Sequence, residues 1–572
     1  MSNFLWKIGG EAGFGIMTVG MSFSKIATRS GYHIFDYAEY PSLIRGGHNT
    51  YEVMVSDQEV FAQKQPVDIL VCLNKETYIN HKHRLTPQSR VIYDPQDVEI
   101  TEDVIKIAVP FKEMKNEHKA MQIMVNTIAL GASLAIIDAD ISIFYDIIEK
   151  EFGRKGQEVV DFNKKFADLG FTYVKEHYSG QIQPLLSRKT DKQKLVMTGN
   201  DAFSMGAAAS DCKWYGAYPM TPSSTVLTSL AAWEHKTGMV VRHAEDEIAV
   251  VNSALGVAFA GARASVGTSG GGFALMVEAL SYAGIAEIPI VVFLSQRPGP
   301  ATGMPTWTEQ AELLFAVNAG HGEFPKIVIA PGDIDEMLRY TAQAFDLADI
   351  YQTPVIVMAD KYLSESHKSI YQDEVHSIFA NHTPDRGKTI TQFDGAKYLR
   401  YQITDDGISP RLLPGFPGQF YQANSYEHEE DSHTTEHAEP RMKQVEKRAR
   451  KVETYLKKHY EAPRVFGNQD TAEAVFVSWG GNKGPILEAM KDLESKGRKT
   501  AYIHMTHLYP VDPSKITPLF HKDKRYILVE NNSHGQLGQL LRLQTGIDLT
   551  ERFLKYDGRP IYKEELVNYI AK

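Results

Sequence analysis

Three acidic residues, Glu245, Asp246 and Glu247, begin a stretch of sequence that is otherwise almost wholly apolar. Acids are common in the first turn of a helix, since the helix dipole favours negative charge there. The helix predicted over residues 246–260 is apolar on nearly every face, so we expect it to be buried. A buried acid needs a partner, and an apolar environment raises the pKa of a carboxyl group, which suits proton sharing with a ring nitrogen. The segment therefore predicts acid–base chemistry at the start of a buried helix.

The segment YPMTPSS at residues 218–224 combines rigid residues with hydroxyl-bearing ones. Pro219 and Pro222 restrict the backbone, and the hydroxyls that follow are well suited to cap a helix. From these residue types alone, a loop that ends in a helix cap is slightly favoured over a binding loop.

Two further segments lie where predicted strands end. GTSGGGF at residues 267–273 follows a strand and opens a helix, so its backbone amides can face a ligand, although a glycine-rich loop alone is a weak signal. QRPGPATG at residues 296–303 follows a buried strand, at the edge where open α/β sheets bind ligands. Arg297 can hold a carboxylate there through two hydrogen bonds. A surface arginine on a loop is an equally good interpretation of the same residues.

These segments belong to a region in which short apolar strands alternate with helices. Such alternation predicts a parallel sheet that is covered by helices on both faces. The predicted strands are KLVMTG, MVVRH, RASVG, IPIVVFLS, KIVIAP and PVIVMAD, and the predicted helices include residues 246–260, 272–283 and 333–348.

The first 185 residues predict another α/β unit. A strand at residues 4–10 leads through a glycine-rich turn into a helix at residues 16–27. The apolar runs at 67–73 and 90–94 are typical of buried parallel strands. A long helix is expected over residues 118–137, and the polar and basic residues that follow about residue 181 indicate a linker.

A third α/β unit is predicted from about residue 466, with strands AVFVSWG, TAYIHM and RYILVE and helices over residues 484–496 and 536–543. The preceding residues 376–465 are polar, rich in His, Glu and Lys, and end in a charged helix. We interpret them as a long connection over the surface. His433 and His437 would share one face if their segment were helical and could then bind a metal, but a solvated acidic loop is the favoured interpretation.

The composition excludes several classes of protein. The 572 residues carry a net charge of -10, which argues against nucleic acid as a main partner. The two cysteines, Cys72 and Cys212, exclude a disulfide framework and any cysteine-ligated zinc or iron–sulfur site built from this chain alone. No signal peptide is recognised, and polar residues interrupt the uncharged stretch at 120–137, so we predict a cytoplasmic protein that does not enter a membrane.

Taken together, in this order and spacing, the four segments resemble the 2-oxoacid:ferredoxin oxidoreductase family. YPMTPSS is similar to that family's YPxTPSS motif, AEDE to its thiamine-activating glutamate region, and TSGGGF to its TSGPGF loop, with Gly271 in place of proline. QRPGPATGMPTWTEQAELL also resembles a recurrent family sequence. The similarity is greatest to the alpha subunit of 2-oxoglutarate:ferredoxin oxidoreductases with a gamma domain fused at the N-terminus.

The resemblance extends over nearly the whole chain and implies its division into domains. GGEAGFGI and PSLIRGGHN are similar to gamma-domain motifs, and VSWGGNKG, HLYP and VENNSHGQL to a transketolase C-terminal-type domain. The implied fold is α/β, with three α/β domains. They are a gamma-type domain at 1–185, a thiamine pyrimidine-binding domain at 194–375, a polar extension at 376–465, and a transketolase C-terminal-like domain at 466–572.

The same resemblance implies roles for individual residues. Glu247 would be catalytic and contact N1′ of the thiamine pyrimidine, while Thr221 and Arg297 would bind the substrate. Further cofactor contacts would come from Tyr218, Pro219, Thr268, Ser269 and Gly270, and coenzyme A would meet Ser42, Arg45, Gly46 and Gly47. No metal ligand is assigned to this chain.

The resemblance also implies partners. Thiamine diphosphate enzymes hold Mg²⁺ and the diphosphate with a Gly-Asp-Gly segment followed by Asn, and this sequence has none. A beta subunit would supply those ligands together with a 4Fe-4S cluster, so that thiamine diphosphate is shared between two chains of an (αβ)₂ complex. The expected reaction is the reversible, coenzyme A-dependent oxidative decarboxylation of 2-oxoglutarate to succinyl-CoA and CO₂ with reduction of ferredoxin, a step of the tricarboxylic acid cycle.

Three alternatives stay open. The substrate can instead be pyruvate or a branched-chain 2-oxoacid. The chain can be a component of a non-redox thiamine-dependent decarboxylase or a transketolase-like enzyme. It can also be a nucleotide-binding scaffold without catalysis, as its glycine-rich start would allow.

Overall fold

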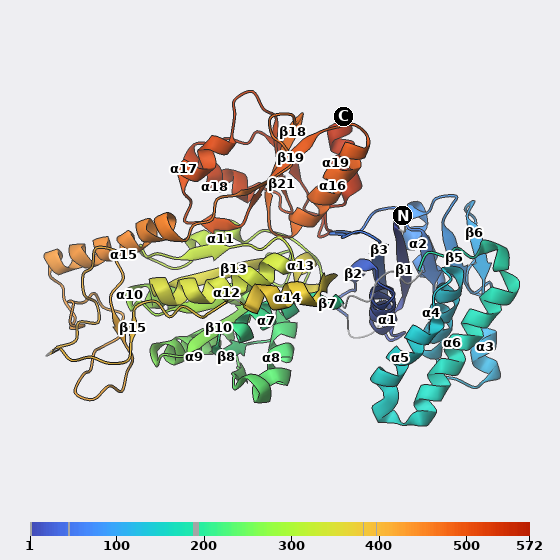
Figure 1. Ribbon diagram of the computed structural model, residues 1–572, viewed down its shortest axis with the longest axis horizontal. Coiled ribbons are helices and arrows are strands. Elements are labelled where there is room, and N and C mark those ends of the chain that lie inside the picture. Colours follow the sequence, from blue (N-terminus) through green and yellow to red (C-terminus); the bar gives the residue numbers. More distant parts are fainter. Residues whose placement is uncertain (1–2, 44–45, 187–193, 381, 396) are drawn as a thin grey trace. The chain divides into compact units, whose positions relative to one another are not determined.

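The computed structural model describes residues 3–43, 46–186, 194–380, 382–395 and 397–572. These residues form two compact units (Figure 1). The first unit contains the chain up to Met197 together with Glu365–Glu374 and Tyr562–Lys572. The second contains Thr198–Ser364 and Val375–Ile561.

The first unit is built on a mixed sheet whose eight described strands follow the order β6-β5-β4-β1-β3-β2-β14-β7. The predicted strands at 67–73 and 90–94 are indeed parallel, because β1 pairs in parallel with β4 and β4 with β5. The antiparallel pairing of β3 with β1 and β2 was not predicted. The strands are β1 (Asn3–Glu11), β2 (His33–Glu39), β3 (His48–Ser56), β4 (Ile69–Cys72), β5 (Arg90–Tyr93), β6 (Ile105–Ala108), β7 (Lys194–Thr198) and β14 (His367–Tyr371).

Helices pack around this sheet, and one predicted helix is wrong in its first part. The predicted helix over 118–137 is α4, but it begins only at Met124. A separate helix ends at Glu117, and Lys119 has a φ of 49°, which a continuous helix does not allow. The helices are α1 (Ile16–Arg29), α2 (Lys75–His81), α3 (Phe111–Glu117), α4 (Met124–Ile136), α5 (Ile141–Phe152), α6 (Gln157–His177) and α19 (Lys563–Ala571).

Two glycines let α4 and α6 approach each other closely. A Cβ atom at Gly131 would come within 2.0 Å of the Ala167 carbonyl oxygen, and one at Gly170 within 1.9 Å of the Ile128 carbonyl oxygen. Any side chain at either position would separate the helices. These contacts fix α4 against α6 in the core of the first unit.

The second unit contains the predicted parallel sheet. Its seven described strands follow the order β20-β12-β13-β11-β10-β8-β9, and all neighbours are parallel except β20, which runs antiparallel to β12. The strands are β8 (Cys212–Ala217), β9 (Val240–His243), β10 (Arg263–Thr268), β11 (Ile290–Gln296), β12 (Ile327–Ile329), β13 (Pro354–Asp360) and β20 (His507–Tyr509). The helices that accompany them are α7 (Gly199–Ala209), α8 (Ser224–Thr237), α9 (Glu247–Phe259), α10 (Gly270–Ile285), α11 (Leu313–Asn318), α12 (Ile334–Tyr351) and α13 (Lys361–Glu365).

The C-terminal part of the second unit has a sheet of its own, with the order β17-β19-β18-β21-β22. The three strands predicted there are β18, β19 and β21, and the two predicted helices are α16 and α18. The elements are β17 (Arg464–Phe466), β18 (Ala474–Trp479), α16 (Lys483–Ser495), β19 (Thr500–Met505), α17 (Pro513–Ile516), β21 (Tyr526–Glu530), α18 (Gln536–Thr545) and β22 (Glu551–Leu554). Among the residues described in both units, no helix has the length and apolar character needed to cross a bilayer.

The polar extension is more closely packed than a surface connection. It contains the last part of α14 (Gln372–Ala380), a short pair of strands, β15 (Thr389–Ile390) and β16 (Arg411–Leu412), and the charged helix α15 (Ala438–Lys458). One side of α15 is buried, including Lys447 and Lys451. The prediction of a connection that lies over the surface is therefore wrong for this side of the helix, because its lysines pair with a buried acid.

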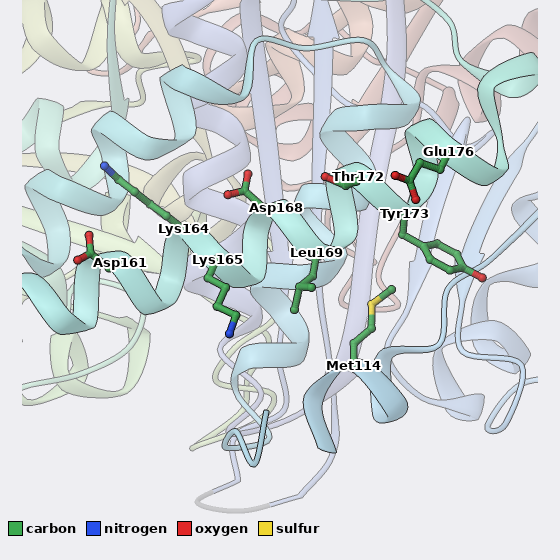
Figure 2. A pocket seen from close by; sticks show the side chains of 9 residues that line it. All are labelled: Met114, Asp161, Lys164, Lys165, Asp168, Leu169, Thr172, Tyr173 and Glu176. Carbon is green, nitrogen blue, oxygen red and sulfur yellow. The ribbon is translucent and has the colours of Figure 1, made fainter. Parts of the chain in front are cut away.

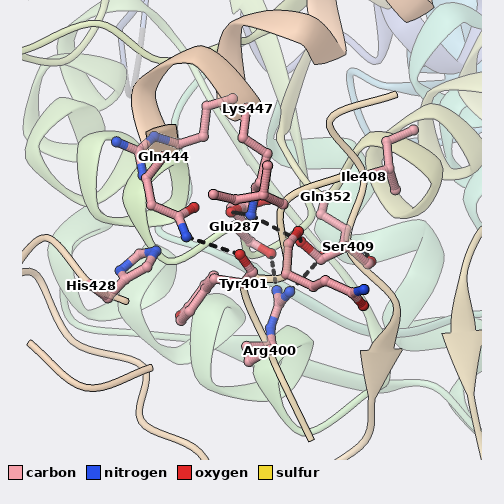
Figure 3. A network of polar contacts seen from close by, with 12 residues as sticks. Glu287, Gln352, Arg400, Tyr401, Ile408, Ser409, His428, Gln444 and Lys447 are labelled. Atoms are coloured by element: carbon pink, nitrogen blue, oxygen red, sulfur yellow. Dashed lines mark hydrogen bonds and ion pairs between the residues drawn. The ribbon is translucent and has the colours of Figure 1, made fainter. Parts of the chain in front are cut away.

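That acid is Glu287, which follows the end of α10 (Figure 3). The Nζ atoms of Lys447 and Lys451 lie 2.6 Å and 2.5 Å from its carboxylate oxygens, and all three side chains are at most 1% exposed. Arg400 donates to the backbone oxygen of Glu287 at 2.8 Å. Burial alone would raise the pKa of Glu287, but Lys447, Lys451 and Arg400 together hold it well below its usual range.

We expect Glu287→Gln to lower the free energy of unfolding by about 3–5 kcal/mol at pH 7, since it leaves two buried lysines without a counter-charge. A carboxyl whose pKa is depressed by folding stabilises the fold above its unfolded pKa of about 4.3, and this contribution is lost as the pH falls. The difference between the variant and the wild type should therefore shrink below about pH 4. Urea unfolding measures the free energy of unfolding of each protein. Glu436→Gln, a change at an exposed glutamate, is the control. Equal stability of both variants would contradict the prediction.

Candidate active site

The four segments singled out in the sequence follow strands that are neighbours in the second unit's sheet. YPMTPSS follows β8, the acidic turn follows β9, the glycine turn follows β10 and Arg297 follows β11. These strands are adjacent and parallel in the order β11-β10-β8-β9. The carboxyl ends of parallel strands meet at one edge of a sheet, where open α/β folds bind ligands. The structure thus brings the four segments to one edge.

The three acids at the start of α9 have different surroundings. The Asp246 side chain caps the helix by accepting a hydrogen bond from the backbone N–H of Ala249 at 2.7 Å, and Glu245 is exposed. Glu247 is only 3% exposed. The Thr268 hydroxyl, at the end of β10, donates to Glu247 Oε1 at 3.4 Å. Of the three acids, Glu247 is therefore the one whose carboxyl lies inside the protein.

The glycines that follow β10 and form the first turn of α10, Gly270 to Gly272, leave room for two carboxyl groups. A Cβ atom at Gly272 would lie 2.2 Å from Glu247 Oε1 and 2.1 Å from the Thr268 hydroxyl. A Cβ atom at Gly270 would lie 2.5 Å from Glu312 Oε1. At Gly271, in contrast, the nearest atom would be 3.9 Å away, so this position has space for a side chain. No pattern in the sequence marks Glu312 as a site residue, although it lies in the segment QRPGPATGMPTWTEQAELL.

One hydrogen bond within the YPMTPSS segment and one from helix α7 hold it in place. Ser223 occupies the N-cap position of α8, but its hydroxyl donates back to the Met220 carbonyl at 2.8 Å, so the expected side-chain cap is not formed. The buried Asn200 donates to the Pro222 carbonyl at 2.7 Å. Neither the sequence pattern around Asn200 nor its position in α7 indicated this role.

Arg297 lies beside this segment and is half-buried. Its Nη1 donates to the Thr221 carbonyl at 2.6 Å. Within the described chain, no carboxylate lies at ion-pair distance from Arg297. Burial lowers the pKa of Arg297, and the nearby Glu312 opposes this effect. The two substrate candidates, Thr221 and Arg297, are therefore in direct contact, and the guanidinium keeps hydrogen-bonding capacity for a ligand.

Several buried polar atoms near this edge make no hydrogen bond to any described residue. They are the Ser269 hydroxyl, the Tyr215 hydroxyl and Glu312 Oε2. Tyr215 belongs to β8, and its hydroxyl lies close to β10, since a Cβ atom at Gly267 would come within 2.0 Å of it. Buried polar groups nearly always have partners in the functional state of a protein. Their grouping at the sheet edge indicates a site for a ligand with polar substituents.

The residues predicted to contact coenzyme A belong to the first unit. Arg45 lies outside the described residues. Gly46 and Gly47 have φ angles of 77° and 81°, values that favour glycine, and Ser42 is exposed. The backbone N–H of Ala12 donates to the Gly47 carbonyl at 3.3 Å, which connects the two glycine-rich turns. The assignment of coenzyme A to these residues stays a prediction.

The first unit also has an open hollow of about 550 Å³ along α6 and α3 (Figure 2). Lys164 and Asp168 line it, but Lys164 pairs with Glu149 at 2.5 Å and Asp168 accepts a hydrogen bond from Tyr145. Such alternating, mutually paired charges are typical of a solvated helix face. None of the predicted coenzyme A residues lines this hollow.

The histidines of the polar extension do not form the alternative metal site. His437 immediately precedes α15 and His433 lies in the loop before it, so the two do not share a helical face. Among the described residues of either unit, no group of three or more His, Cys, Asp or Glu side chains is arranged to hold a metal ion.

Comparison with known proteins defines the class of the second unit. The family model described as "Pyruvate flavodoxin/ferredoxin oxidoreductase, thiamine diP-bdg" matches residues 205–447, and that described as "Pyruvate ferredoxin/flavodoxin oxidoreductase" matches residues 5–173. The site therefore lies in a thiamine diphosphate-binding α/β domain of an oxidoreductase.

Relatives over the full length define the family. The 2-oxoacid:ferredoxin oxidoreductase subunit alpha of Saccharolobus solfataricus is 33% identical, with 98% of this chain and 96% of that protein covered. The 2-oxoglutarate oxidoreductase subunit KorA of Mycobacterium tuberculosis is 25% identical, with 100% and 91% covered. A solved structure of 2-oxoglutarate:ferredoxin oxidoreductase from Magnetococcus marinus, with 2-oxoglutarate, coenzyme A and succinyl-CoA bound, has a TM-score of 0.92 at 29% identity over 100% of this chain and 99% of that one. This chain belongs to the family of 2-oxoacid:ferredoxin oxidoreductase alpha subunits.

Proposed function

We propose that this chain is the substrate-binding subunit of a 2-oxoglutarate:ferredoxin oxidoreductase. The reaction joins the thiol of coenzyme A to the acyl group of 2-oxoglutarate, releases CO₂ and a proton, and passes two electrons to ferredoxin. The observation that carries the proposal is the buried Glu247 carboxyl at the sheet edge, between Thr268 and Gly272. The similarity to the Magnetococcus marinus enzyme and to KorA supports 2-oxoglutarate as the substrate.

The residues at the edge fit the aminopyrimidine end of thiamine diphosphate. The Ser269 and Tyr215 hydroxyls are buried and have no hydrogen-bond partner among the described residues, and Gly270 and Gly272 bring no side chains to this edge. Glu247 would hold a proton at the ring nitrogen N1′, because its carboxyl is kept from water by burial. When bound, thiamine diphosphate would supply the electron sink that decarboxylation of a 2-oxoacid requires. Tyr218 and Pro219 would border the site from the end of β8.

The partner subunit is proposed from the exposed surface of α9 and α10. The sequence predicted that α9 is buried on every side, which is wrong for the chain alone, since Ile248 is 50% exposed and Leu275 on α10 is 49% exposed. Exposed apolar side chains on neighbouring helices can mark a site of contact with another protein. We propose that a beta subunit covers it and supplies the Mg²⁺, diphosphate and 4Fe-4S ligands, in an (αβ)₂ complex. The two cysteines of this chain, which are both buried, cannot ligate such a cluster alone.

The proposal is tested by purifying the chain together with its co-expressed beta subunit and measuring iron content and activity. We expect coenzyme A-dependent reduction of ferredoxin or methyl viologen, fastest with 2-oxoglutarate. Faster reduction with pyruvate or a branched-chain 2-oxoacid would show that this other 2-oxoacid is the substrate. An active complex without iron would instead support a non-redox decarboxylase or transketolase-like enzyme.

We expect Arg297→Met to raise the KM for the 2-oxoacid about 10- to 100-fold, because a charge-assisted hydrogen bond contributes roughly 1.5–3 kcal/mol. Arg297→Lys should recover part of this loss, since it keeps the charge but not the planar pair of donors. Steady-state kinetics of the complex measure the effect. Lys236→Met, which removes an exposed cation from α8, is the control for net charge. An unchanged KM in Arg297→Met would show that Arg297 does not bind the substrate.

A further inference from the structure

Glu312 is a second acid at the sheet edge, and its position is fixed from two sides. It directly precedes α11, and its backbone N–H donates to the side-chain oxygen of Gln296, the last residue of β11, at 3.1 Å. Its Oε1 lies against Gly270, where a Cβ atom would approach it within 2.5 Å. The carboxyl group of Glu312 therefore lies between the end of β11, which Arg297 follows, and the first residue of α10.

The two buried acids lie against the same turn. Glu247 contacts it at Gly272 and Glu312 at Gly270, two residues apart in the sequence. Glu247 has a hydrogen-bond partner in Thr268. Glu312 Oε2, in contrast, is buried and has no hydrogen-bond partner in the part of the chain that the structure describes. The environment of Glu312 is therefore incomplete in the chain alone.

Burial and the charged groups nearby decide the protonation of Glu312. Burial and the neighbouring Glu309 raise the pKa of Glu312 to about 8, although Arg297 and the backbone N–H groups of Glu312 and Ala311 act in the opposite direction. Below that pH the side chain is a neutral carboxylic acid, which has one O–H donor. A buried donor without an acceptor is costly, so an acceptor is expected in the working enzyme. A neutral Glu312 also leaves the charge of Arg297 available to an anionic ligand.

We propose that Glu312 positions the substrate, by donating a hydrogen bond from its unpartnered oxygen to a carboxylate oxygen of the 2-oxoacid bound at Arg297. This inference rests on the proposed function. Deprotonation of Glu312 removes the donor and places a negative charge beside the substrate carboxylate. Substrate binding should therefore weaken as the pH rises through the pKa of Glu312, while the rate at saturation changes little.

The test measures kcat and KM for the 2-oxoacid between pH 6.5 and 9.5 in the complete complex of both subunits. The wild-type KM should be constant at low pH and rise about tenfold above about pH 8. Glu312→Gln keeps a donor and cannot ionise, so its KM should stay within about threefold of the wild type at pH 7 and lose the alkaline rise. Glu312→Ala should raise the KM about tenfold at pH 7. Glu309→Gln should move the alkaline rise to lower pH, because it removes a neighbouring negative charge.

A pair of glycine variants tests the geometry independently of the acid itself. Gly270→Ala should raise the KM as Glu312→Ala does, because the new methyl group displaces the carboxyl. Gly271→Ala places the same methyl group one residue further on, where the nearest atom would be 3.9 Å away, and should leave the KM unchanged.

Three results would overturn the inference. An alkaline rise in the KM of Glu312→Gln that equals the wild-type rise would assign the titration to another group. An unchanged KM in Glu312→Ala at pH 7, in a complex that oxidises the 2-oxoacid, would remove Glu312 from the substrate site and leave the proposed function intact. A wild-type complex that oxidises no 2-oxoacid would overturn both.

Discussion

We expect Glu247→Gln to lower the kcat of the complex for 2-oxoacid oxidation by about 10²- to 10⁴-fold, the usual contribution of a positioned acid or base. Glutamine has nearly the same shape as glutamate, so the packing at the start of α9 should persist. It cannot, however, exchange a proton with the N1′ nitrogen. The loss should therefore appear in kcat, with little change in the KM for the 2-oxoacid, and steady-state viologen reduction measures both.

Glu245→Gln is the matched control, because it removes an acid two residues away that is exposed to solvent. Its activity should equal that of the wild type. Full activity in Glu247→Gln would contradict the mechanism proposed here, and the noncatalytic nucleotide-binding scaffold would then regain support. A loss of activity accompanied by loss of the beta subunit would indicate an assembly defect, so gel filtration of each variant accompanies the kinetics.

Gly272→Ala should lower the activity by about 10²-fold or more without changing any charge. The added methyl carbon would lie 2.2 Å from Glu247 Oε1, so the carboxyl group must move. A displacement of about 1 Å at a reacting group can reduce a rate by about 10²-fold. The same steady-state assay measures the effect, and the far-ultraviolet circular dichroism of the variant should match that of the wild type.

Gly271→Ala is the control for this variant, since its methyl group would have no neighbour closer than 3.9 Å. It should keep most of its activity. The TSGPGF loop that this segment resembles has a proline at the position of Gly271. Comparable losses in the two alanine variants would show that the turn tolerates no side chain at all. The loss of activity in Gly272→Ala could then not be attributed to displacement of the Glu247 carboxyl group.

The parallel sheet and the meeting of the four segments at one edge of it could be predicted from the sequence. Strands such as β10 and β11 are short apolar runs buried on both faces, and such runs have a clear signature. The segments that follow them meet at one edge as a consequence of parallel topology. Glu247 also stood out, because an acid that begins an apolar helix is rare without a partner.

The remaining features depend on contacts between residues far apart in the sequence. Lys447 and Lys451 look like surface lysines on a charged helix, and their buried counter-charge, Glu287, lies 160 residues before Lys447. Glu312 looks like an acid near the start of a short helix until Gly270 is placed against it. The antiparallel strands β2 and β3 contain polar residues that concealed their pattern, and the break at Lys119 has no glycine or proline to mark it.

The edge strand β20 links two of the predicted domains, since it crosses the boundary between them. Its residues, His507–Tyr509, belong to the C-terminal segment of the chain, yet they pair with β12 of the parallel sheet. Gln310, near the candidate site, also accepts a hydrogen bond from Asn482 at 2.7 Å. A fragment that ended before residue 466 would expose the unpaired backbone of β12 and would be prone to aggregate. The two segments are therefore expected to fold as one unit.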